Sequence, residues 1–193
     1  SAENDDRLGA VVRRATLEGA PVFEVTKLEL EALTQGAVHQ GVAMEIAAYD
    51  YADALELLDR VSATGRKPLF IALDQVTDPH NLGAVLRSAG AFGADGVIIP
   101  QRRSADVNAT VWKVSAGAAA RVPVAKETNL VRTLEAFKAR GCFVVGLDGN
   151  ASVSVDNLNL ADQPLVLVTG AEGKGLSRLV RETCDEIASI NIR

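Results

Sequence analysis

The residues that this 193-residue chain has in short supply exclude several kinds of site. Its two cysteines, Cys142 and Cys184, are too few for a disulfide scaffold, so we expect a reducing, cytoplasmic environment. Neither the cysteines nor the two histidines, His39 and His80, have the spacing of metal ligands, so we expect no metal. No apolar run approaches the roughly 18 residues that a membrane span needs, and we expect no membrane contact.

Three common active-site signatures are also missing. A Walker A loop needs G-x-x-x-x-G-K followed by Ser or Thr, but Gly170 lies only three residues before Gly173, and Gly175 follows Lys174. No G-x-G-x-x-G follows the first predicted strand of the regular α/β region, and no G-x-S-x-G elbow supports a serine hydrolase. These absences disfavour an unrelated nucleotide-binding α/β protein and a hydrolase.

The composition is that of a globular protein whose charged residues are distributed unevenly along the chain. Hydrophobic residues make up 48% and charged residues 23%, which excludes a disordered chain. Residues 1–66 contain 6 Lys and Arg against 12 Asp and Glu, whereas residues 67–193 contain 14 against 13. This asymmetry predicts two modules. The first residues, SAENDDRLGA, lack the apolar core of a signal peptide and an initiator Met, so we expect the natural protein to begin upstream.

The first module is predicted to be a small α/β piece. Its expected elements are helices at about 5–19 and 26–33 and strands at 22–25 and 41–46. Thr26 and Glu29 form a predicted capping box at the start of the second helix. A connecting helix at 49–61 and a polar break up to Pro68 follow. About 48 residues are few for a free-standing domain, so we interpret this module as part of one.

The second module has the pattern of a parallel sheet. Its expected strands lie at 69–73, 96–100, 121–125, 142–147, 165–169 and 186–192. Its expected helices lie at about 80–92, 105–116, 129–140 and 175–184. Nearly continuous apolar strands separated by helices predict an α/β fold with a parallel sheet covered by helices on both faces. Ligands of such folds bind at the carboxyl ends of the strands.

The first unusual strand end is the segment 74–89, DQVTDPHNLGAVLRSA. Asp78 and the proline after it predict a turn and a helix start. Asn81 falls in the first turn of this helix, and Arg87 lies within about 120° of it around the axis. A cation in an apolar helix is costly unless it is paired or faces a cleft. Either Arg87 faces a ligand, or it pairs with Asp74 or Asp78 at the surface.

The second unusual strand end is the segment 166–177, VLVTGAEGKGLS. Three glycines within six residues allow a close approach of the backbone to a ligand, or positive φ angles. Glu172 would be held in this loop, away from any helix. The alternative is an ordinary strand-to-helix turn. A third strand end carries Arg102 and Arg103, a pair that suits phosphate contacts, although a plain solvated loop explains it equally well.

Together these segments resemble the SpoU-type (TrmH-like) RNA ribose methyltransferases of the SPOUT superfamily. The stretch DPHNLGAVLRSA (78–89) is similar to the family's first motif nearly residue for residue, and LVLVTGAEGKGLS (165–177) is similar to its second, in the same order. Upstream, HQGV (39–42) is similar to the end of the family's small N-terminal RNA-recognition domain. The resemblance covers essentially the whole chain and implies that the opening strand of that domain precedes Ser1.

The resemblance implies transfer of a methyl group from S-adenosylmethionine to a ribose 2′-hydroxyl of RNA. Ribosomal RNA, and within it guanosine, is the first expectation, and transfer RNA is the alternative. It also implies a homodimer, no metal, and a deep trefoil knot in the C-terminal part of the sheet. We therefore expect a partial recognition domain at 1–48, a linker at 49–68 and a SPOUT methyltransferase domain at 69–193.

The matched motifs also imply roles for individual residues. The catalytic residues would be Asn81, Arg87 and Glu172. The cofactor would be bound by Leu147, Asp148, Gly149, Thr169, Gly170, Ala171, Gly173 and Ile190. RNA would be bound by His80, Arg102 and Arg103. Because the pKa of arginine lies above about 12, Arg87 is a poor general base. It would either act as one nonetheless or stabilise the developing alkoxide electrostatically.

The chain departs from the family at its third motif, where a strand ending in Ile-Pro leads into a Ser-Leu-Asn helix. Residues 187–193 read IASINIR, with Asn191 in place of the proline. In the family that helix closes the knot, lines the cofactor and contacts the second subunit, so we expect this chain to lack it, through either disorder or deletion. The same departure favours the main alternative, a catalytically inactive RNA-binding or ribosome-assembly protein with this fold.

Overall fold

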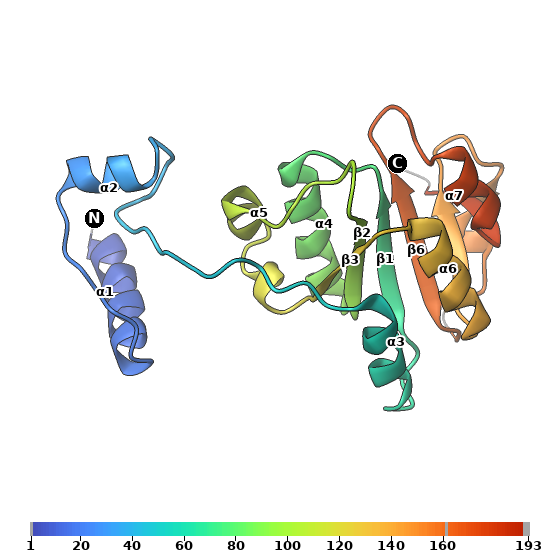
Figure 1. The fold of residues 1–193 in the computed structure, drawn as a ribbon, viewed down its shortest axis with the longest axis horizontal. Helices are drawn as coiled ribbons and strands as arrows, with labels where there is room; N and C mark the ends of the chain where they lie inside the picture. The colour runs from blue at the N-terminus through green and yellow to red at the C-terminus, as the bar shows by residue number, and fades with distance from the viewer. Residues whose placement is uncertain (1, 161, 191–193) are drawn as a thin grey trace. The chain divides into compact units, whose positions relative to one another are not determined.

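The computed structural model describes residues 2–160 and 162–190, which divide into two compact units (Figure 1). The first unit is Ser1–Ala48 and the second is Tyr49–Arg193. Residues 49–68, expected to form a linker, therefore lie within the second unit. Asn191 and the two residues after it lie outside the described residues, so the structure does not bear on the departure at the third motif.

The second unit is built on a seven-stranded sheet in the order β3-β2-β1-β6-β4-β7-β5. All pairings are parallel, which confirms the predicted fold class. The strands are β1 (Leu69–Asp74), β2 (Gly96–Pro100), β3 (Val124–Glu127), β4 (Phe143–Leu147), β5 (Val153–Ser154), β6 (Leu165–Gly170) and β7 (Glu186–Ser189). The central strand β6 pairs with β1 up to Asp74 and with β4 up to Leu147, so the carboxyl ends of three strands meet at one edge.

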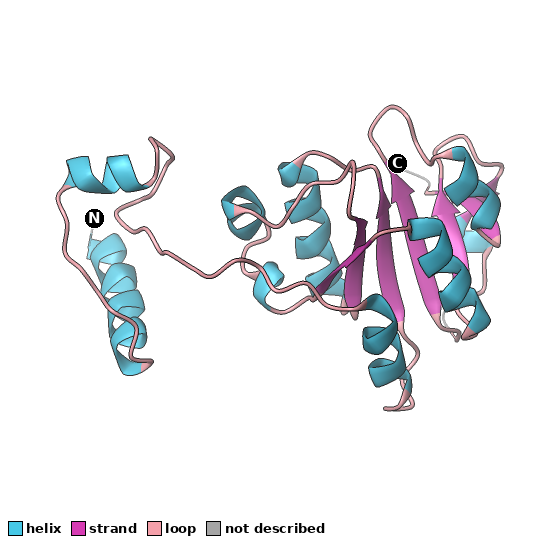
Figure 2. Cartoon of the chain, in the orientation of Figure 1, coloured by secondary structure: helices cyan, strands magenta, loops and turns pink. Residues whose placement is uncertain are grey.

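Helices cover both faces of this sheet (Figure 2). They are α3 (Ala54–Ser62), α4 (Pro79–Phe92), α5 (Ala109–Val114), α6 (Leu130–Ala139) and α7 (Arg178–Thr183), with short 3-10 turns at Ala118–Ala120 and Val155–Asn157. Successive side chains of a strand point to opposite faces of the sheet, so each strand contributes to two cores. In β2, Ile98 packs with α3 and α6, whereas Val97 and Ile99 pack with α4 and α5.

The segment before β1 differs from the predicted helix at 49–61. The helix begins at Ala54, because the side chain of Asp53 caps it by accepting hydrogen bonds from the amides of Leu55 and Glu56, both at 2.9 Å. Residues 49–52 are extended instead and lie along β3. The amide of Ala52 donates to the carbonyl of Val124 at 2.9 Å, and so the strand pairing of the sheet continues into this segment.

The first unit contains two helices, α1 (Ala2–Leu17) and α2 (Lys27–Leu33), and no strand among its described residues. The predicted strands at 22–25 and 41–46 are therefore wrong here. A strand needs a hydrogen-bonded neighbour, and neither segment pairs with another. Their apolar side chains stay exposed, as in Phe23 at 78% and Met44 at 80%, and Leu30 is the one buried side chain among the described residues of this unit.

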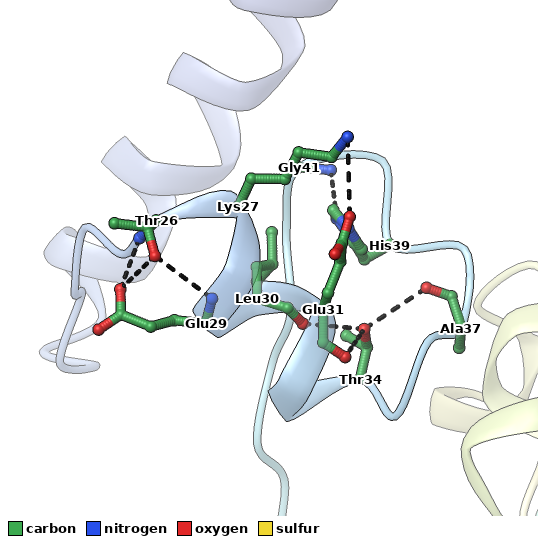
Figure 3. A network of polar contacts seen from close by, with 9 residues as sticks. All are labelled: Thr26, Lys27, Glu29, Leu30, Glu31, Thr34, Ala37, His39 and Gly41. Carbon is green, nitrogen blue, oxygen red and sulfur yellow. Dashed lines mark hydrogen bonds and ion pairs between the residues drawn. The ribbon is translucent and has the colours of Figure 1, made fainter.

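The capping box predicted at the start of α2 is confirmed (Figure 3). The amide of Thr26 donates to the Glu29 carboxylate at 2.7 Å, and the amide of Glu29 donates back to the Thr26 hydroxyl at 3.3 Å. The hydrogen bond from the backbone amide of Thr26 lowers the pKa of Glu29. A reciprocal cap satisfies two amides that the helix itself leaves unpaired. Local sequence therefore specifies this helix even though it buries little.

Candidate active site

The carboxyl ends of β1, β4 and β6 carry two adjacent pockets. The first, here called the side-chain pocket, has a volume of about 400 Å³. Its lining residues are Gln75, Val76, Thr77, Asp78, Asn81, Arg103, Ala171, Glu172 and Lys174. Two carboxylates and two cations therefore surround it, together with two amide side chains. Such a lining can bind a ligand that is both anionic and rich in hydrogen-bonding groups.

The start of α4 sets the geometry of this pocket. Asp78 is the N-cap, and its carboxylate accepts a hydrogen bond from the amide of His80 at 2.8 Å. Pro79 occupies the first helical position, where no amide hydrogen is needed. This start places Asn81 within the first turn of the helix, against the pocket. The sequence D-P-x-N thus fixes the direction in which α4 leaves the sheet.

Two contacts hold the turn after β1 in place. The carboxylate of Asp74 is buried and accepts a hydrogen bond from the amide of Ser177 at 2.6 Å. The carbonyl of Val76 accepts one from the amide of Ala105 at 2.9 Å. The first contact joins this turn to the segment that precedes α7, and the second joins it to the loop after β2. Three chain segments are therefore locked together around the side-chain pocket.

The second pocket, here called the glycine pocket, has a volume of about 350 Å³. Its lining residues are Leu147, Asp148, Gly149, Asn150, Thr169, Gly170, Ala171, Gly173, Lys174 and Gly175. Four of these ten are glycines, which expose backbone amides and carbonyls instead of side chains. The pocket falls within the range of roughly 300–1,000 Å³ that is typical of small-ligand sites.

The loop 171–175 closes back on itself at the end of β6. The carbonyl of Ala171 accepts hydrogen bonds from the amides of Gly175 at 2.8 Å and Lys174 at 3.3 Å. Gly173 and Gly175 have left-handed φ angles of 75° and 66°. A Cβ atom on Gly170 would lie 2.1 Å from the backbone of Gly175, so no other residue fits there without moving the loop. This segment is more constrained than an ordinary strand-to-helix turn.

Asp148 is the acidic side chain of the glycine pocket. Its carboxylate accepts a hydrogen bond from the amide of Asn150 at 2.9 Å and forms an ion pair with Arg181. The hydrogen bond from Asn150, followed by the contact with Arg181, lowers the pKa of Asp148. The carboxylate is therefore ionised at neutral pH, while its position at the end of β4 is fixed from two sides.

The two pockets share a wall, because Ala171 and Lys174 line both. Glu172 lies between them in the chain and lines the side-chain pocket. Ligands bound in the two pockets would therefore both lie against the turn that contains Ala171 and Lys174. Such a pair of neighbouring sites suits transfer of a small group from one bound molecule to another.

The structure brings most of the expected site residues to these two pockets. The side-chain pocket contains Asn81, Glu172 and Arg103; the glycine pocket contains Leu147, Asp148, Gly149, Thr169, Gly170 and Gly173, and Ala171 lines both. His80, Arg87, Arg102 and Ile190 line neither pocket. Arg87 is exposed on α4, and it forms no ion pair with Asp74 or Asp78, so the surface pairing considered for it is not formed.

Ile190 is 56% exposed and follows the end of β7 at Ser189. Sequence reasoning did not assign roles to several lining residues, namely Gln75, Thr77, Asn150, Lys174 and Gly175. Four of these, all but Asn150, lie inside the two unusual strand-end segments 74–89 and 166–177, so position next to a strand end was the available signal. The ion pair of Arg181 with Asp148 had no such signal, because it joins residues 33 positions apart.

The cysteines take no part in this site. Burial raises the pKa of both Cys142 and Cys184 to about 11, so both remain protonated thiols at neutral pH. No group of three or more His, Cys, Asp and Glu side chains in the described residues is arranged to hold a metal ion. Among those residues no helix combines the length and the apolar character that crossing a membrane requires.

Comparison with known proteins now assigns the site to a family. Residues 68–193, more than half of the chain, match the family model described as "SpoU rRNA Methylase family". This chain belongs to the SpoU rRNA methylase family. Residues 1–52 match a second model, described as "RNA 2'-O ribose methyltransferase substrate binding". Both pockets described above lie within the residues matched by the SpoU model.

Several SpoU relatives are similar over nearly the whole chain. A protein of Mycobacterium avium, named an uncharacterized tRNA/rRNA methyltransferase, is 51% identical over 189 residues, which are 97% of this chain and 60% of that protein. A relative with the same name from Mycobacterium ulcerans is 50% identical over the same shares. The chain thus spans about 60% of the length of the curated relatives that it matches.

Solved structures of SpoU proteins have the same fold. The methyltransferase AviRb of Streptomyces viridochromogenes, in complex with the cofactor AdoMet, is 27% identical with a TM-score of 0.65, covering 89% of this chain and 71% of that one. An AdoMet-bound rRNA methyltransferase of Sinorhizobium meliloti has a TM-score of 0.72 at 23% identity, covering 97% and 69%. At that identity the second likeness bears on the fold alone.

Proposed function

We propose that the protein containing this chain transfers a methyl group from S-adenosylmethionine to a ribose 2′-hydroxyl of RNA. The observation that carries this proposal is the pair of pockets that share the wall formed by Ala171 and Lys174. One is lined by backbone and the other by charged and amide side chains. Membership of the SpoU rRNA methylase family supports the reaction class, and the substrate-binding model matched by residues 1–52 supports a ribose of RNA as the acceptor.

The chemistry of its lining suits the glycine pocket to S-adenosylmethionine. Gly149, Gly173 and Gly175 have open space where a Cβ would stand, so a ligand can approach their backbone closely. Leu147 and Thr169 line the same pocket, and the carboxylate of Asp148, which is paired with Arg181, is its acidic group. When bound, the cofactor supplies an electrophilic methyl group on a sulfonium. The residues of the glycine pocket would hold the cofactor.

The side-chain pocket would take the RNA nucleotide. Asn81 and Glu172 offer hydrogen bonds to a ribose, and Arg103 and Lys174 offer positive charge to its phosphates. A ribose hydroxyl is a weak nucleophile, so it must be oriented and its developing negative charge must be stabilised. The similarity to the family motif assigns this electrostatic role to Arg87, although Arg87 lines neither pocket. A guanidinium is not a proton acceptor, so the hydroxyl proton would pass to water as the methyl–oxygen bond forms and the methyl–sulfur bond breaks.

The roles of the two parts of the chain, the class of RNA and the assembly are proposed on the same grounds. Residues 1–48 would recognise RNA and residues 69–193 would perform the transfer, with ribosomal RNA favoured over transfer RNA and with two copies of the protein forming the working enzyme. His80 and Arg102 would contact RNA outside the side-chain pocket. The acidic balance of the first 66 residues is compatible with this role, because structured RNA is recognised by shape and local contacts as well as by overall charge.

The test is transfer of labelled methyl groups by the natural protein. It is incubated with labelled S-adenosylmethionine and either ribosomal or transfer RNA, and the RNA is then hydrolysed in alkali. A 2′-O-methyl group blocks cleavage of the adjacent phosphodiester, so ribose label is recovered in dinucleotides and base label in mononucleotides. We expect label in dinucleotides. Label in mononucleotides, or in no RNA, contradicts the proposal, and RNA binding without cofactor binding favours the inactive RNA-binding alternative.

A further inference from the structure

Two residues of the side-chain pocket have backbone conformations that their side chains disfavour. Gln75, directly after β1, has a φ angle of 61°, and Arg103, after β2, has one of 58°. Glycine adopts such left-handed angles freely, whereas a residue with a Cβ atom pays a steric penalty. Among the described residues of the unit 49–193, the other non-glycine in this region is Ala116, which lines neither pocket.

The surrounding contacts explain how the strain persists. On one side of Gln75, the buried Asp74 is tied to the amide of Ser177 at 2.6 Å. On the other side, the carbonyl of Val76 is tied to the amide of Ala105, two residues after Arg103, at 2.9 Å. The two strained turns are thus fastened to each other. A strained residue held by its neighbours is a reason to look for a function of its side chain.

Both side chains lack an internal partner. Within the part of the chain that the structure describes, neither the amide of Gln75 nor the guanidinium of Arg103 forms a hydrogen bond or an ion pair. Gln75 is nevertheless partly buried against the pocket. A carboxamide both donates and accepts hydrogen bonds, and a guanidinium presents a fixed fork of donors that matches a phosphate. These groups are therefore free to bind a ligand that carries both kinds of partner.

We propose that Gln75 and Arg103 form a nucleotide-binding pair, in which Arg103 holds a phosphate of the RNA and Gln75 hydrogen-bonds the adjoining nucleoside. This inference rests on the proposed function of the side-chain pocket as the RNA site and adds Gln75 to it as a substrate-binding residue. If these positions served the turns alone, glycine would serve them better. The retained side chains are therefore explained by what they bind.

Replacement by glycine separates the two explanations, because it removes the side chain and relieves the backbone at once. We expect Gln75→Gly and Arg103→Gly, made in the natural protein, to keep or raise the Tm. The kcat/KM for RNA should fall about 3- to 10-fold for Gln75→Gly and roughly 10- to 100-fold for Arg103→Gly. The Kd for S-adenosylmethionine should stay within about twofold. Ala116→Gly is the matched control and should change neither kcat/KM nor the Kd.

Conservative variants sharpen the test. Gln75→Asn retains the amide and tolerates a left-handed backbone, and Arg103→Lys retains the charge, so each should recover part of the lost kcat/KM. Wild-type kcat/KM in both glycine variants overturns the inference, and so does an equal loss of cofactor affinity. A wild-type protein that transfers no methyl group contradicts the proposed function instead. In that case the Kd for RNA is measured for the same variants, and the inference predicts that it changes by the same factors as given for kcat/KM.

Discussion

The two pockets at the end of the sheet are built in opposite ways. The side-chain pocket is lined by groups such as Asp78, Asn81 and Glu172, which project from a helix start and a loop. The glycine pocket is lined largely by the backbone of two loops, with glycine at four of its ten positions. In the first, the chemistry depends on which side chains are present. In the second, it depends on how closely the chain can approach a ligand.

This difference indicates how one edge of the sheet can bind two different ligands. A backbone-lined pocket offers the same hydrogen-bonding groups whatever its side chains are, which suits an invariant cofactor. A pocket lined by side chains can change its specificity through single substitutions without altering the fold, which suits a substrate that differs between relatives. We therefore expect substitutions in the two pockets to affect cofactor binding and RNA binding separately, and the variants below test that separation.

The largest effect on folding stability is expected from Gly170→Ala. Its Cβ would lie 2.1 Å from the carbonyl carbon and oxygen of Gly175, so the loop 171–175 must move. We expect a loss of about 1–3 kcal/mol in the free energy of unfolding. We also expect at least a tenfold weaker affinity for S-adenosylmethionine, about 1.4 kcal/mol of binding. Thermal unfolding and calorimetric titration measure the two quantities.

The control for that variant is Gly149→Ala in the same pocket. A Cβ on Gly149 meets no atom within 4 Å, and its φ angle is not left-handed. The added methyl group should therefore leave the Tm unchanged. If Gly170→Ala and Gly149→Ala have the same stability, the loop is not constrained as described, and the contrast between the two pockets loses its main physical basis.

The largest effect on turnover tests the role carried over to Arg87. We expect Arg87→Ala to lower kcat by at least about 100-fold, the size typical of losing one electrostatic group at a reacting oxygen. The Kd for S-adenosylmethionine should stay within a few-fold, because Arg87 lines neither pocket. Arg121→Ala removes another exposed arginine outside both pockets and should have no effect. Turnover retained by Arg87→Ala would show that the motif match assigns this residue wrongly.

The sheet was predictable because its strands carry their own signal. Runs such as LFIAL and LVLVT are apolar on both faces, and a strand with that pattern has to be buried between two layers of helices. The order of the strands was not predictable, since β6 joins the sheet between β1 and β4, and its partner residues in β1 lie more than 90 positions away in sequence. That order is what brings Asp74, Gly170 and Leu147 to one edge.

The wrong predictions of secondary structure have a common physical cause. The segments 22–25 and 41–46 have local β propensity, but a strand exists only where a neighbour pairs with it, and none does in the described first unit. The helix expected from residue 49 fails for a tertiary reason as well. The hydroxyl of Tyr49 accepts a hydrogen bond from the amide of Val124, and that of Tyr51 accepts one from Val107. These contacts hold the segment extended, and no local pattern encodes them.

The smallest effect concerns the charge of the glycine pocket. The amide of Asn150 and the side chain of Arg181 lower the pKa of Asp148 from its ordinary value of 3.8. A carboxyl group with a lowered pKa stabilises the folded state above its unfolded pKa, and that contribution is lost as the pH falls through the folded pKa. Asp148→Asn should therefore have a lower Tm than the wild type at pH 7, and the difference should shrink as the pH falls below 3.8.

The matched control is Asp50→Asn, which replaces an exposed carboxylate of the same unit that has no ion pair in the described chain. Its Tm should follow the wild type at every pH. A Tm difference for Asp148→Asn that is constant with pH would mean that shape rather than charge matters at this position. Asp148 would then act only as a hydrogen-bond acceptor for the amide of Asn150. A pH-dependent difference instead shows that the charge of Asp148 stabilises the fold at the edge of the glycine pocket.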